Sequence, residues 1–183
     1  MFQKTAYSLL IDANLLFKRT GIADKMKVAD LGCGSSGQFV FGPAKLVGDK
    51  GKVYAVDIMK TVLETVRRRA VQENAKNVVI IWSDLEIFGA TKIESGSLDV
   101  AMLINTLYQS HKRLEILRES IRMMKNKGKL LVVEWKNISI PFGPPAEERV
   151  NAEQLILILT KLGLKLDDEF EAGPYHYGLI FEK

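Results

Sequence analysis

Val28-Ala-Asp-Leu-Gly-Cys-Gly-Ser-Ser-Gly37 is the stretch that decides the fold of this chain. It places three glycines between a short apolar run and a helical pattern, which is the setting of the G-x-G-x-x-G turn. Glycines at such a turn let the backbone bend sharply and let a ligand approach it closely. The helix that follows offers free N–H groups at its first turn. The stretch therefore predicts a strand, a ligand-binding turn and a helix, in that order.

Around this stretch the chain alternates short apolar runs with helical patterns, which is typical of βαβ units and a mostly parallel sheet. Two runs near the end are separated by only a few residues, too few for a crossover helix, so they should pair as an antiparallel hairpin. We therefore expect an α/β fold of three layers, with a doubly wound, mostly parallel sheet of seven strands that ends in this hairpin. The predicted strands are residues 27–31, 52–56, 78–82, 98–104, 129–134, 164–170 and 177–181, and the clearest helices are 61–73, 112–125 and 152–162.

Length and composition indicate one globular domain. The 183 residues suffice for a single core, and 47% apolar with 26% charged residues are ordinary globular values. We expect one domain over residues 1–183, made of a helical lid at 1–25 and a Rossmann-like core at 26–183. The lid is predicted because residues 2–18 form an amphipathic helical pattern that has no sheet partner of its own.

Charge and cysteine content limit the partners of the chain. Cys33 is the only cysteine, which excludes an internal disulfide and a thiolate metal cluster, and we expect no metal site. A cytoplasmic setting fits this, and no apolar run reaches the roughly 18 residues that a membrane span needs. The net charge of +4 is scattered along the sequence, which disfavours a nucleic-acid partner. The oligomeric state is left open between monomer and homodimer.

Two carboxylates near the glycine turn bear on its ligand. Asp57 ends the second predicted strand, where it can accept hydrogen bonds from both hydroxyls of a ribose or cap the helix that follows. Asp30 lies two positions before Gly32, so its charge would repel a pyrophosphate by a few kcal/mol, on the order of a near-surface ion pair. S-adenosylmethionine carries an ammonium and a sulfonium and would be attracted instead. Asp30 thus favours this methyl donor over NAD, with a purely structural role in holding loop N–H groups as the alternative.

Further segments extend the pattern in order along the chain. They read Val-Tyr-Ala-Val-Asp-Ile at 53–58, Trp-Ser-Asp-Leu at 82–85, Ser-Gly-Ser-Leu-Asp-Val-Ala-Met-Leu-Ile-Asn-Thr-Leu-Tyr at 95–108 and Lys-Gly-Lys-Leu-Leu-Val-Val-Glu-Trp at 127–135. Together with the glycine turn, these segments resemble a class I, seven-stranded S-adenosylmethionine-dependent methyltransferase. The resemblance covers residues 26–183 and is closest to the small-molecule branch of the ubiquinone/menaquinone-biosynthesis type.

The resemblance implies S-adenosylmethionine as the cofactor and S-adenosylhomocysteine as its product. It also implies which residues bind the cofactor. They fall into four groups: residues at the methionine end and in the turn, a residue at the ribose, residues at the adenine, and a residue beneath the methionine and beside the methyl acceptor. In that order the expected set is Asp30, Gly32, Cys33, Gly34, Ser36 and Gly37; then Asp57; then Ile58, Ser83, Asp84 and Leu85; then Asn105.

One departure from the family pattern concerns the glycine spacing. Such families usually run G-x-G-x-G, whereas here Ser36 stands at the third position and Gly37 follows one residue later. We expect a turn that is one residue longer, with altered contacts at residues 35–37.

The acceptor of the methyl group should be small and partly apolar. Methyl transfer from a sulfonium is an in-line displacement with a good leaving group, so positioning and the exclusion of water can suffice. Tyr108 and Glu134 are the catalytic candidates should the acceptor have to lose a proton. His111, Tyr175 and His176 follow them. The expected acceptor pocket combines Phe2, Tyr7 and Leu10 with the loop at 141–145.

Two alternatives stay open on the sequence alone. A small Rossmann oxidoreductase that uses NAD is supported by the glycine turn and by Asp57, and is opposed by Asp30 and the terminal hairpin. A non-catalytic subunit that binds S-adenosylmethionine and acts through protein interactions is kept open by the altered glycine spacing.

Overall fold

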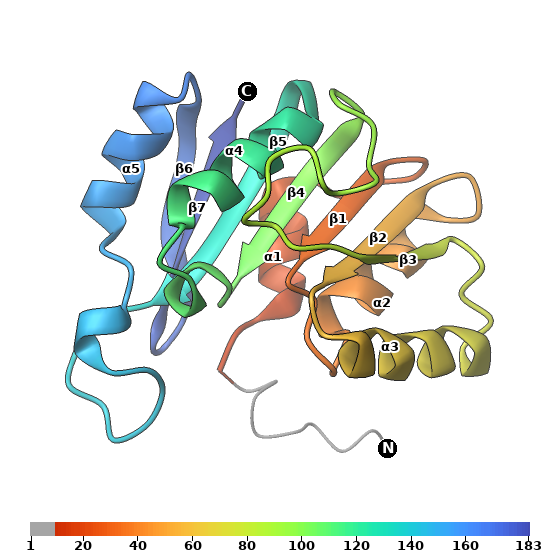
Figure 1. Ribbon diagram of the computed structural model, residues 1–183, viewed down its shortest axis with the longest axis horizontal. Coiled ribbons are helices and arrows are strands. Elements are labelled where there is room, and N and C mark those ends of the chain that lie inside the picture. The colour runs from red at the N-terminus through yellow and green to blue at the C-terminus, as the bar shows by residue number, and fades with distance from the viewer. Residues whose placement is uncertain (1–9) are drawn as a thin grey trace.

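The computed structural model describes residues 10–183, which form one twisted sheet covered by helices on both faces (Figure 1). The seven strands of this part of the chain lie in the order β3-β2-β1-β4-β5-β7-β6. The first five are mutually parallel, and β7 runs antiparallel between β5 and β6. The expected α/β fold, with its terminal antiparallel hairpin, is confirmed. The strands are β1 (Lys27–Leu31), β2 (Lys52–Asp57), β3 (Val78–Trp82), β4 (Leu98–Ile104), β5 (Met124–Trp135), β6 (Lys165–Gly173) and β7 (His176–Glu182).

The central strands are buried because both of their faces meet helices. β1 has four successive buried residues from Val28 to Leu31, and six of the seven residues of β4 are buried. Such runs are apolar without alternation, as is expected of parallel strands between two helical layers. One layer holds α1 (Ala13–Thr20), α2 (Gln38–Val47) and α3 (Lys60–Gln72), and the other holds α4 (Arg113–Met123) and α5 (Ala152–Lys161).

The first described helix is shorter than the sequence pattern predicts. Within the described residues it begins at Ala13 and ends at Thr20, because Asp12 accepts a hydrogen bond from Leu15 N at 3.1 Å and acts as its N-cap. Its buried side chains Leu16 and Phe17 belong to the core beside α2. Residues 10–12, which the sequence pattern assigns to a helix over 2–18, are therefore not helical. The earlier part of that predicted helix, with Phe2 and Tyr7, lies outside the described residues.

Several element boundaries also differ from the predicted ones, most clearly between α4 and β5. α4 ends at Met123 and β5 begins directly at Met124, five residues before the predicted start. The early part of β5 pairs irregularly with β4, since the register shifts between Leu98 and Val100. At such an irregularity one strand carries extra residues that have no regular partner. The first part of β5 therefore lacks the continuous apolar run by which strands are predicted from sequence.

The topology fixes where a ligand can bind. β1 has β2 on one side and β4 on the other, so the chain reverses its winding direction between β1 and β4. In open parallel sheets, ligands bind at the carboxyl ends of the strands next to such a switch point. The glycine turn follows the carboxyl end of β1 and therefore lies at this place.

Candidate functional site

A cavity of about 390 Å³ opens at the carboxyl ends of the strands, in front of the glycine turn. It is built by the segments that follow β1, β2, β3 and β4. The structure brings seven of the predicted binding residues to this cavity and adds seven that the sequence did not single out. The predicted ones are Gly32, Gly34, Asp57, Ile58, Ser83, Asp84 and Leu85, and the added ones are Met59, Val62, Glu86, Thr106, Gln109, Ser110 and Ile116.

The glycine turn owes its shape to two positions. Gly32 has φ +85°, and a Cβ there would lie 2.7 Å from the hydroxyl oxygen of Thr106, which itself donates to Leu31 O at 2.9 Å. Gly34 has φ +60°, and no atom outside its chain neighbours comes within 4 Å of a Cβ built on it. Gly32 therefore allows the turn to pack against the segment after β4, while Gly34 leaves open space on the cavity side.

Asp57 ties the glycine turn to the start of α3. Its Oδ2 accepts from Gly34 N at 3.1 Å, and its Oδ1 accepts from Met59 N at 2.9 Å, one residue before the helix begins. The alternative role predicted for Asp57, capping of the helix, is not observed, because the N-cap residue of α3 is Met59 and no side chain caps the helix; Asp57 instead holds the segment just before α3 while it lines the cavity. Each carboxylate oxygen has a second lone pair, so the hydroxyls of a bound ribose can still be accepted.

Asp30 is the buried carboxylate of the site. Only 1% of its surface is exposed, and its Oδ2 has no hydrogen-bond partner among the described residues. Burial, and to a smaller degree the neighbouring charge of Asp57, raise the pKa of Asp30 to about 7. An unpaired acidic oxygen beside an open cradle fits a cationic ligand group, because a positive charge would satisfy its missing hydrogen bond and favour its ionised form.

The loop after β3 forms the wall opposite the glycine turn. Ser83 and Thr91 share a hydrogen bond of 3.0 Å between their hydroxyls, and Asp84 Oδ1 accepts from Glu86 N at 2.9 Å. Leu85 is buried, whereas Ile58 across the cavity is 55% exposed. This wall offers a polar edge and apolar surface together, as a purine ring requires.

Glu119 on α4 anchors that loop from behind. Its carboxylate accepts from Gly89 N at 2.8 Å and Thr91 N at 3.0 Å, and it binds the Arg122 guanidinium at 2.8 and 2.9 Å. Burial alone would raise the pKa of Glu119, but these donors outweigh it and lower the pKa to about 2. Arg122 also donates to the carbonyl oxygens of Thr91 and Ile93, both at 3.0 Å. Local sequence patterns do not indicate this network, because it joins α4 to the loop after β3.

Five of the predicted cofactor residues do not line the cavity: Asp30, Asn105 and the three turn residues Cys33, Ser36 and Gly37. The Cys33 side chain is buried in the core, where burial first and the charges of Asp30 and Asp57 next raise the pKa of its thiol. Ser36 is exposed, and its carbonyl accepts from Arg69. Gly37 has φ +55° and caps the start of α2, where a Cβ would meet the ring of Phe41. The third glycine of the motif thus begins the helix here and stays clear of the ligand space.

Asn105 stands at the end of β4 in the left-handed region, with φ +54°. Its backbone N donates to Val133 O at 2.8 Å, and its carbonyl accepts from Gln109 Nε2 at 2.7 Å. The side-chain Nδ2 lies 3.1 Å from His176 Nε2. Asn105 itself does not line the cavity, although Thr106 and Gln109 do. Asparagine tolerates this backbone conformation better than most residues, and a strained position at a strand end is typical of functional turns.

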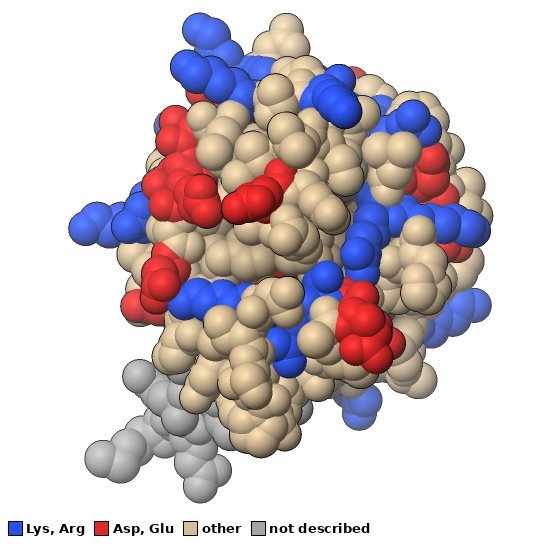
Figure 2. Space-filling model, turned by 90° about the vertical axis from the view of Figure 1, so that its left-hand side faces the viewer, with Lys and Arg blue, Asp and Glu red and all other residues tan. Residues whose placement is uncertain are grey.

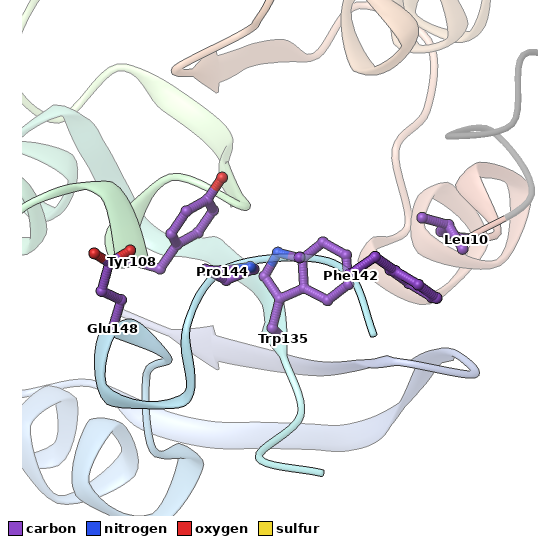
Figure 3. Close-up of a pocket in the computed structure, with 7 residues that line it drawn as sticks. Leu10, Tyr108, Trp135, Phe142, Pro144 and Glu148 are labelled. Atoms are coloured by element: carbon purple, nitrogen blue, oxygen red, sulfur yellow. The ribbon is translucent and has the colours of Figure 1, made fainter. Parts of the chain in front are cut away.

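A second cavity, of about 640 Å³, is shown in Figure 3, and it shares with the first the turn after β4, where Tyr108 lines the second cavity and Thr106 and Gln109 line the first. Its walls are largely aromatic: the Phe142 ring packs edge-on against Trp135 and Tyr175, with centroids 6.2 and 4.9 Å apart. The structure places the predicted Leu10 and part of the predicted loop 141–145 at this cavity. The described lining is Leu10, Tyr108, Trp135, Phe142, Gly143, Pro144 and Glu148.

The candidates for a general base differ sharply in access. Tyr108 lines the second cavity, and His111 is exposed at the surface. Glu134 is fully buried, and its Oε1 accepts from Leu107 N at 2.6 Å beneath the turn after β4. Burial raises the pKa of Glu134 to about 7, despite the backbone N–H groups that lower it. This geometry favours Glu134 as a support of the turn, and Tyr108 as the candidate that an acceptor could touch.

Buried polar atoms without a partner gather at this one edge of the sheet. Within residues 10–183 they belong to the carboxyl end of β1, the ends of β4 and β5, and the start of β7, which the strand pairing brings side by side. Unpaired buried polar groups are costly and are rare in native proteins, so their clustering indicates a place built for ligands. The atoms are Asp30 Oδ2, Asn105 Oδ1, Glu134 Oε2, Trp135 Nε1 and His176 Nδ1.

Comparison with known proteins agrees with this geometry. The family described as "Methyltransferase domain" matches residues 22–165. The demethylmenaquinone methyltransferase of Lactococcus lactis is 28% identical over 131 residues, which are 72% of this chain and 50% of that protein. The ubiquinone/menaquinone biosynthesis C-methyltransferase UbiE of Laribacter hongkongensis is 32% identical over 124 residues, 68% of this chain and 49% of that protein. The chain thus spans about half the length of these curated relatives.

Solved structures resemble the chain over nearly its whole length. A SAM-dependent methyltransferase from Aquifex aeolicus superposes with a TM-score of 0.87 at 26% identity, covering 97% of this chain and 93% of that one. The [4+2]-cyclase SpnF has a TM-score of 0.78 at 15% identity, covering 93% of this chain and 80% of that one. The second likeness concerns the fold alone, and it shows that a protein named for a different reaction shares the same architecture.

Proposed function

Because this chain belongs to the methyltransferase-domain family of class I S-adenosylmethionine-dependent methyltransferases, near the UbiE branch, we propose that it transfers a methyl group from this cofactor to a small acceptor. The observation that carries the proposal is the pair of neighbouring cavities. They meet at the turn after β4, where Thr106 and Gln109 line the first and Tyr108 lines the second. One short segment thus separates a cofactor-sized cavity from an aromatic one.

The first cavity is the proposed cofactor site. Asp30 faces the ammonium group of the methionine end, where its unpaired Oδ2 finds a donor. Asp57 accepts from the ribose hydroxyls next to Gly34. Asp84 and the backbone at Leu85 meet the edge of the adenine. The carboxylate at Asp30 speaks against NAD, because a pyrophosphate bound to the turn would lie near a buried acidic group.

The protein would promote methyl transfer chiefly by holding the cofactor and the acceptor in the right relative position. The bound cofactor supplies an activated methyl group on a sulfonium, which needs no further activation by the protein. The residues of this chain hold the cofactor against β1 and β2, hold the acceptor between aromatic walls, and keep water from the space between them. Tyr108 is the proposed residue in contact with the acceptor, and a general base is not required for acceptors that are already nucleophilic.

The acceptor that fits the second cavity is flat and partly apolar. Trp135 and Phe142 offer ring faces and edges, and the buried Trp135 Nε1 has no partner among the described residues, so an oxygen of the acceptor could receive its hydrogen. The UbiE and demethylmenaquinone methyltransferase relatives bear names of quinone biosynthesis. We therefore take a hydroxylated or keto aromatic ring as the first acceptor class to test.

Surface charge supports a small acceptor over a nucleic acid. On the face shown in Figure 2, basic and acidic side chains are interspersed around an uncharged centre, and no single basic patch forms there. No helix in residues 10–183 is long and apolar enough to cross a membrane. A cytoplasmic location, a small-molecule partner and a monomeric or homodimeric state complete the proposal.

The test is transfer of a labelled methyl group. The purified protein is incubated with S-adenosylmethionine carrying a radioactive methyl, together with a panel of hydroxylated aromatic compounds and fractionated metabolites. We expect label in an organic-soluble product with the wild-type protein, and less label with Asp57→Ala when the cofactor concentration is below saturation. Binding of the cofactor without label in any fraction would contradict the proposed transfer and favour the non-catalytic alternative.

A further inference from the structure

His176 is a fully buried histidine for which the proposed transfer gives no role. It is the first residue of β7, and its ring stacks at a tilt on Trp135, with centroids 4.2 Å apart. Trp135 is a wall of the acceptor cavity, and the neighbour of His176 on its other side is Asn105, at 3.1 Å between Nε2 and Nδ2. His176 thus touches both halves of the site without facing either cavity.

The orientation of the Asn105 amide, with Nδ2 toward His176 Nε2, implies one tautomer of the ring. An amide NH₂ group can only donate, so Nε2 of His176 must accept, and the single ring proton of a neutral imidazole must then be on Nδ1. Nδ1 lies close to the backbone of Leu10, although without good hydrogen-bond geometry. Burial lowers the pKa of His176 to about 4, which keeps the ring neutral near pH 7. The arrangement leaves the other end of the amide, Asn105 Oδ1, without a partner.

The left-handed turn at Asn105 decides which face of the sheet this amide reaches. Along β4, Ala101 and Leu103 point to the layer of α4 and α5, and strict alternation would send residue 105 the same way. Its side chain instead meets His176, which shares a strand face with Ile180 in the layer of α1, α2 and α3. By the same alternation, Asp30 points to the face of Val28, which belongs to that layer too.

Two unpaired acceptor atoms therefore come from neighbouring strands on one face. β1 and β4 pair directly, with Asp30 opposite Met102, and Thr106 next to Asn105 packs on the glycine turn. An ammonium group has three hydrogens to donate, and a single carboxylate oxygen leaves some of them unused. The amide oxygen of Asn105 can take one of these hydrogens if the amide is held in the observed orientation.

We propose that His176 is a positioning residue for the cofactor: it holds the Asn105 amide so that Oδ1 and the Asp30 carboxylate together receive the ammonium group of S-adenosylmethionine. The proposal rests on the proposed function of the first cavity. It gives the C-terminal hairpin a part in binding the cofactor, and it assigns His176 a role other than that of a general base.

The experiment compares two ligands and two substitutions by calorimetric titration. S-adenosylhomocysteine carries the ammonium group, whereas 5′-methylthioadenosine shares the nucleoside and lacks the amino-acid end. His176→Phe keeps a ring against Trp135 and removes the acceptor, while His176→Gln restores an acceptor oxygen. We expect His176→Phe to weaken S-adenosylhomocysteine binding by about tenfold, as for a lost hydrogen bond to a charged group. Binding of 5′-methylthioadenosine should stay within about twofold, and His176→Gln should recover most of the loss.

Other outcomes overturn the proposal. An equal loss for both ligands would show a merely structural role, and no loss for either would show that the amide is not used. If the wild-type protein bound neither ligand, the proposed function itself would fail. Nitrogen NMR of the unmodified protein gives a test that needs no variant: a proton on Nδ1 with a bare Nε2 is expected, and the opposite tautomer would mean that Nδ2, a donor, faces the ligand.

Discussion

At the scale of single residues, the carboxylates of Asp30 and Asp57 differ in their hydrogen bonds. Asp57 has hydrogen bonds to Gly34 N and Met59 N, and it supports the turn whether or not a ligand is present. Asp30 is buried with one unpaired oxygen, and its raised pKa shows that ionising it in the folded chain is costly. This combination is what we expect of the proposed ligand-binding role of Asp30, because functional residues are commonly retained at the expense of stability.

Asp30→Asn should make the chain more stable without ligand and weaker in cofactor binding. The pKa of Asp30 is about 7 when folded and near the ordinary 3.8 when unfolded. The wild-type protein therefore loses stability relative to the variant as the pH rises from about 4 to about 7, and the gap stays constant above that. At pH 8 we expect the variant to be more stable by about 2–4 kcal/mol.

Urea unfolding at pH 4 and pH 8 checks this expectation, with the exposed Asp49→Asn as the matched control. A variant that is less stable than the wild-type protein at pH 8 would show that Asp30 holds the loop structurally. The weakened binding of S-adenosylhomocysteine should also be greater at low salt, because the interaction is between charges.

Asp57→Ala should weaken the binding of S-adenosylhomocysteine by about 1–3 kcal/mol, the cost of removing charge-assisted hydrogen bonds. The measurement is a calorimetric titration, and Glu64→Ala on the exposed face of α3 serves as the control. Unchanged affinity would remove Asp57 from the binding site and leave it only the structural hydrogen bonds to Gly34 N and Met59 N.

Much of the first cavity could be predicted from single residues, because its contacts are local. Gly32, Gly34 and Asp57 follow directly from strand ends, and each strand end is marked by its own apolar run. The Asn105 and His176 contact could not be predicted this way. It joins residues 71 positions apart, and it depends on the left-handed backbone conformation of Asn105, which no sequence pattern predicts.

At the scale of elements, the strands were predictable and the helix ends less so. β1, β3 and β4 have the predicted bounds because each is a short buried run with clear breaks. α1 starts late because Asp12 prefers to cap the helix rather than join it. β5 starts early because its irregular first half carries exposed lysines, which a search for apolar runs passes over.

Glu119→Gln tests whether α4 supports the cofactor site through the loop after β3. The substitution breaks a buried ion pair and weakens the bonds to Gly89 and Thr91, so we expect a loss of about 3 kcal/mol in unfolding free energy. Because the pKa of Glu119 is lowered to about 2, the difference from the wild-type protein should shrink as the pH falls from about 4.5 to about 2.

The control for this substitution lies on the same helix. Glu115 pairs with Arg118 at the same spacing of three residues, but both side chains are partly exposed. Glu115→Gln should therefore cost less than about 0.5 kcal/mol in the same chemical unfolding experiment. Equal losses of unfolding free energy for the two variants would mean that the Glu119 network stabilises the protein no more than an ordinary surface ion pair does.

At the scale of the whole molecule, fold and function rest on different kinds of observation. The sheet order and the terminal hairpin are those of class I methyltransferases, but a cyclase shares this architecture. We propose the ligand site of this chain from three features together: the open glycine turn and Asp57 at one cavity, and the unpaired buried carboxylate of Asp30 on the strand just before that turn. Acceptor identity depends on the walls of the second cavity, which local sequence patterns do not define.

Calorimetric titration of the wild-type protein with S-adenosylmethionine, S-adenosylhomocysteine and NAD tests the central claim most directly. We predict saturable binding of both sulfur compounds at one site per chain and no binding of NAD at the same concentrations. Saturable binding of NAD, with no response to either sulfur compound, would contradict the assignment.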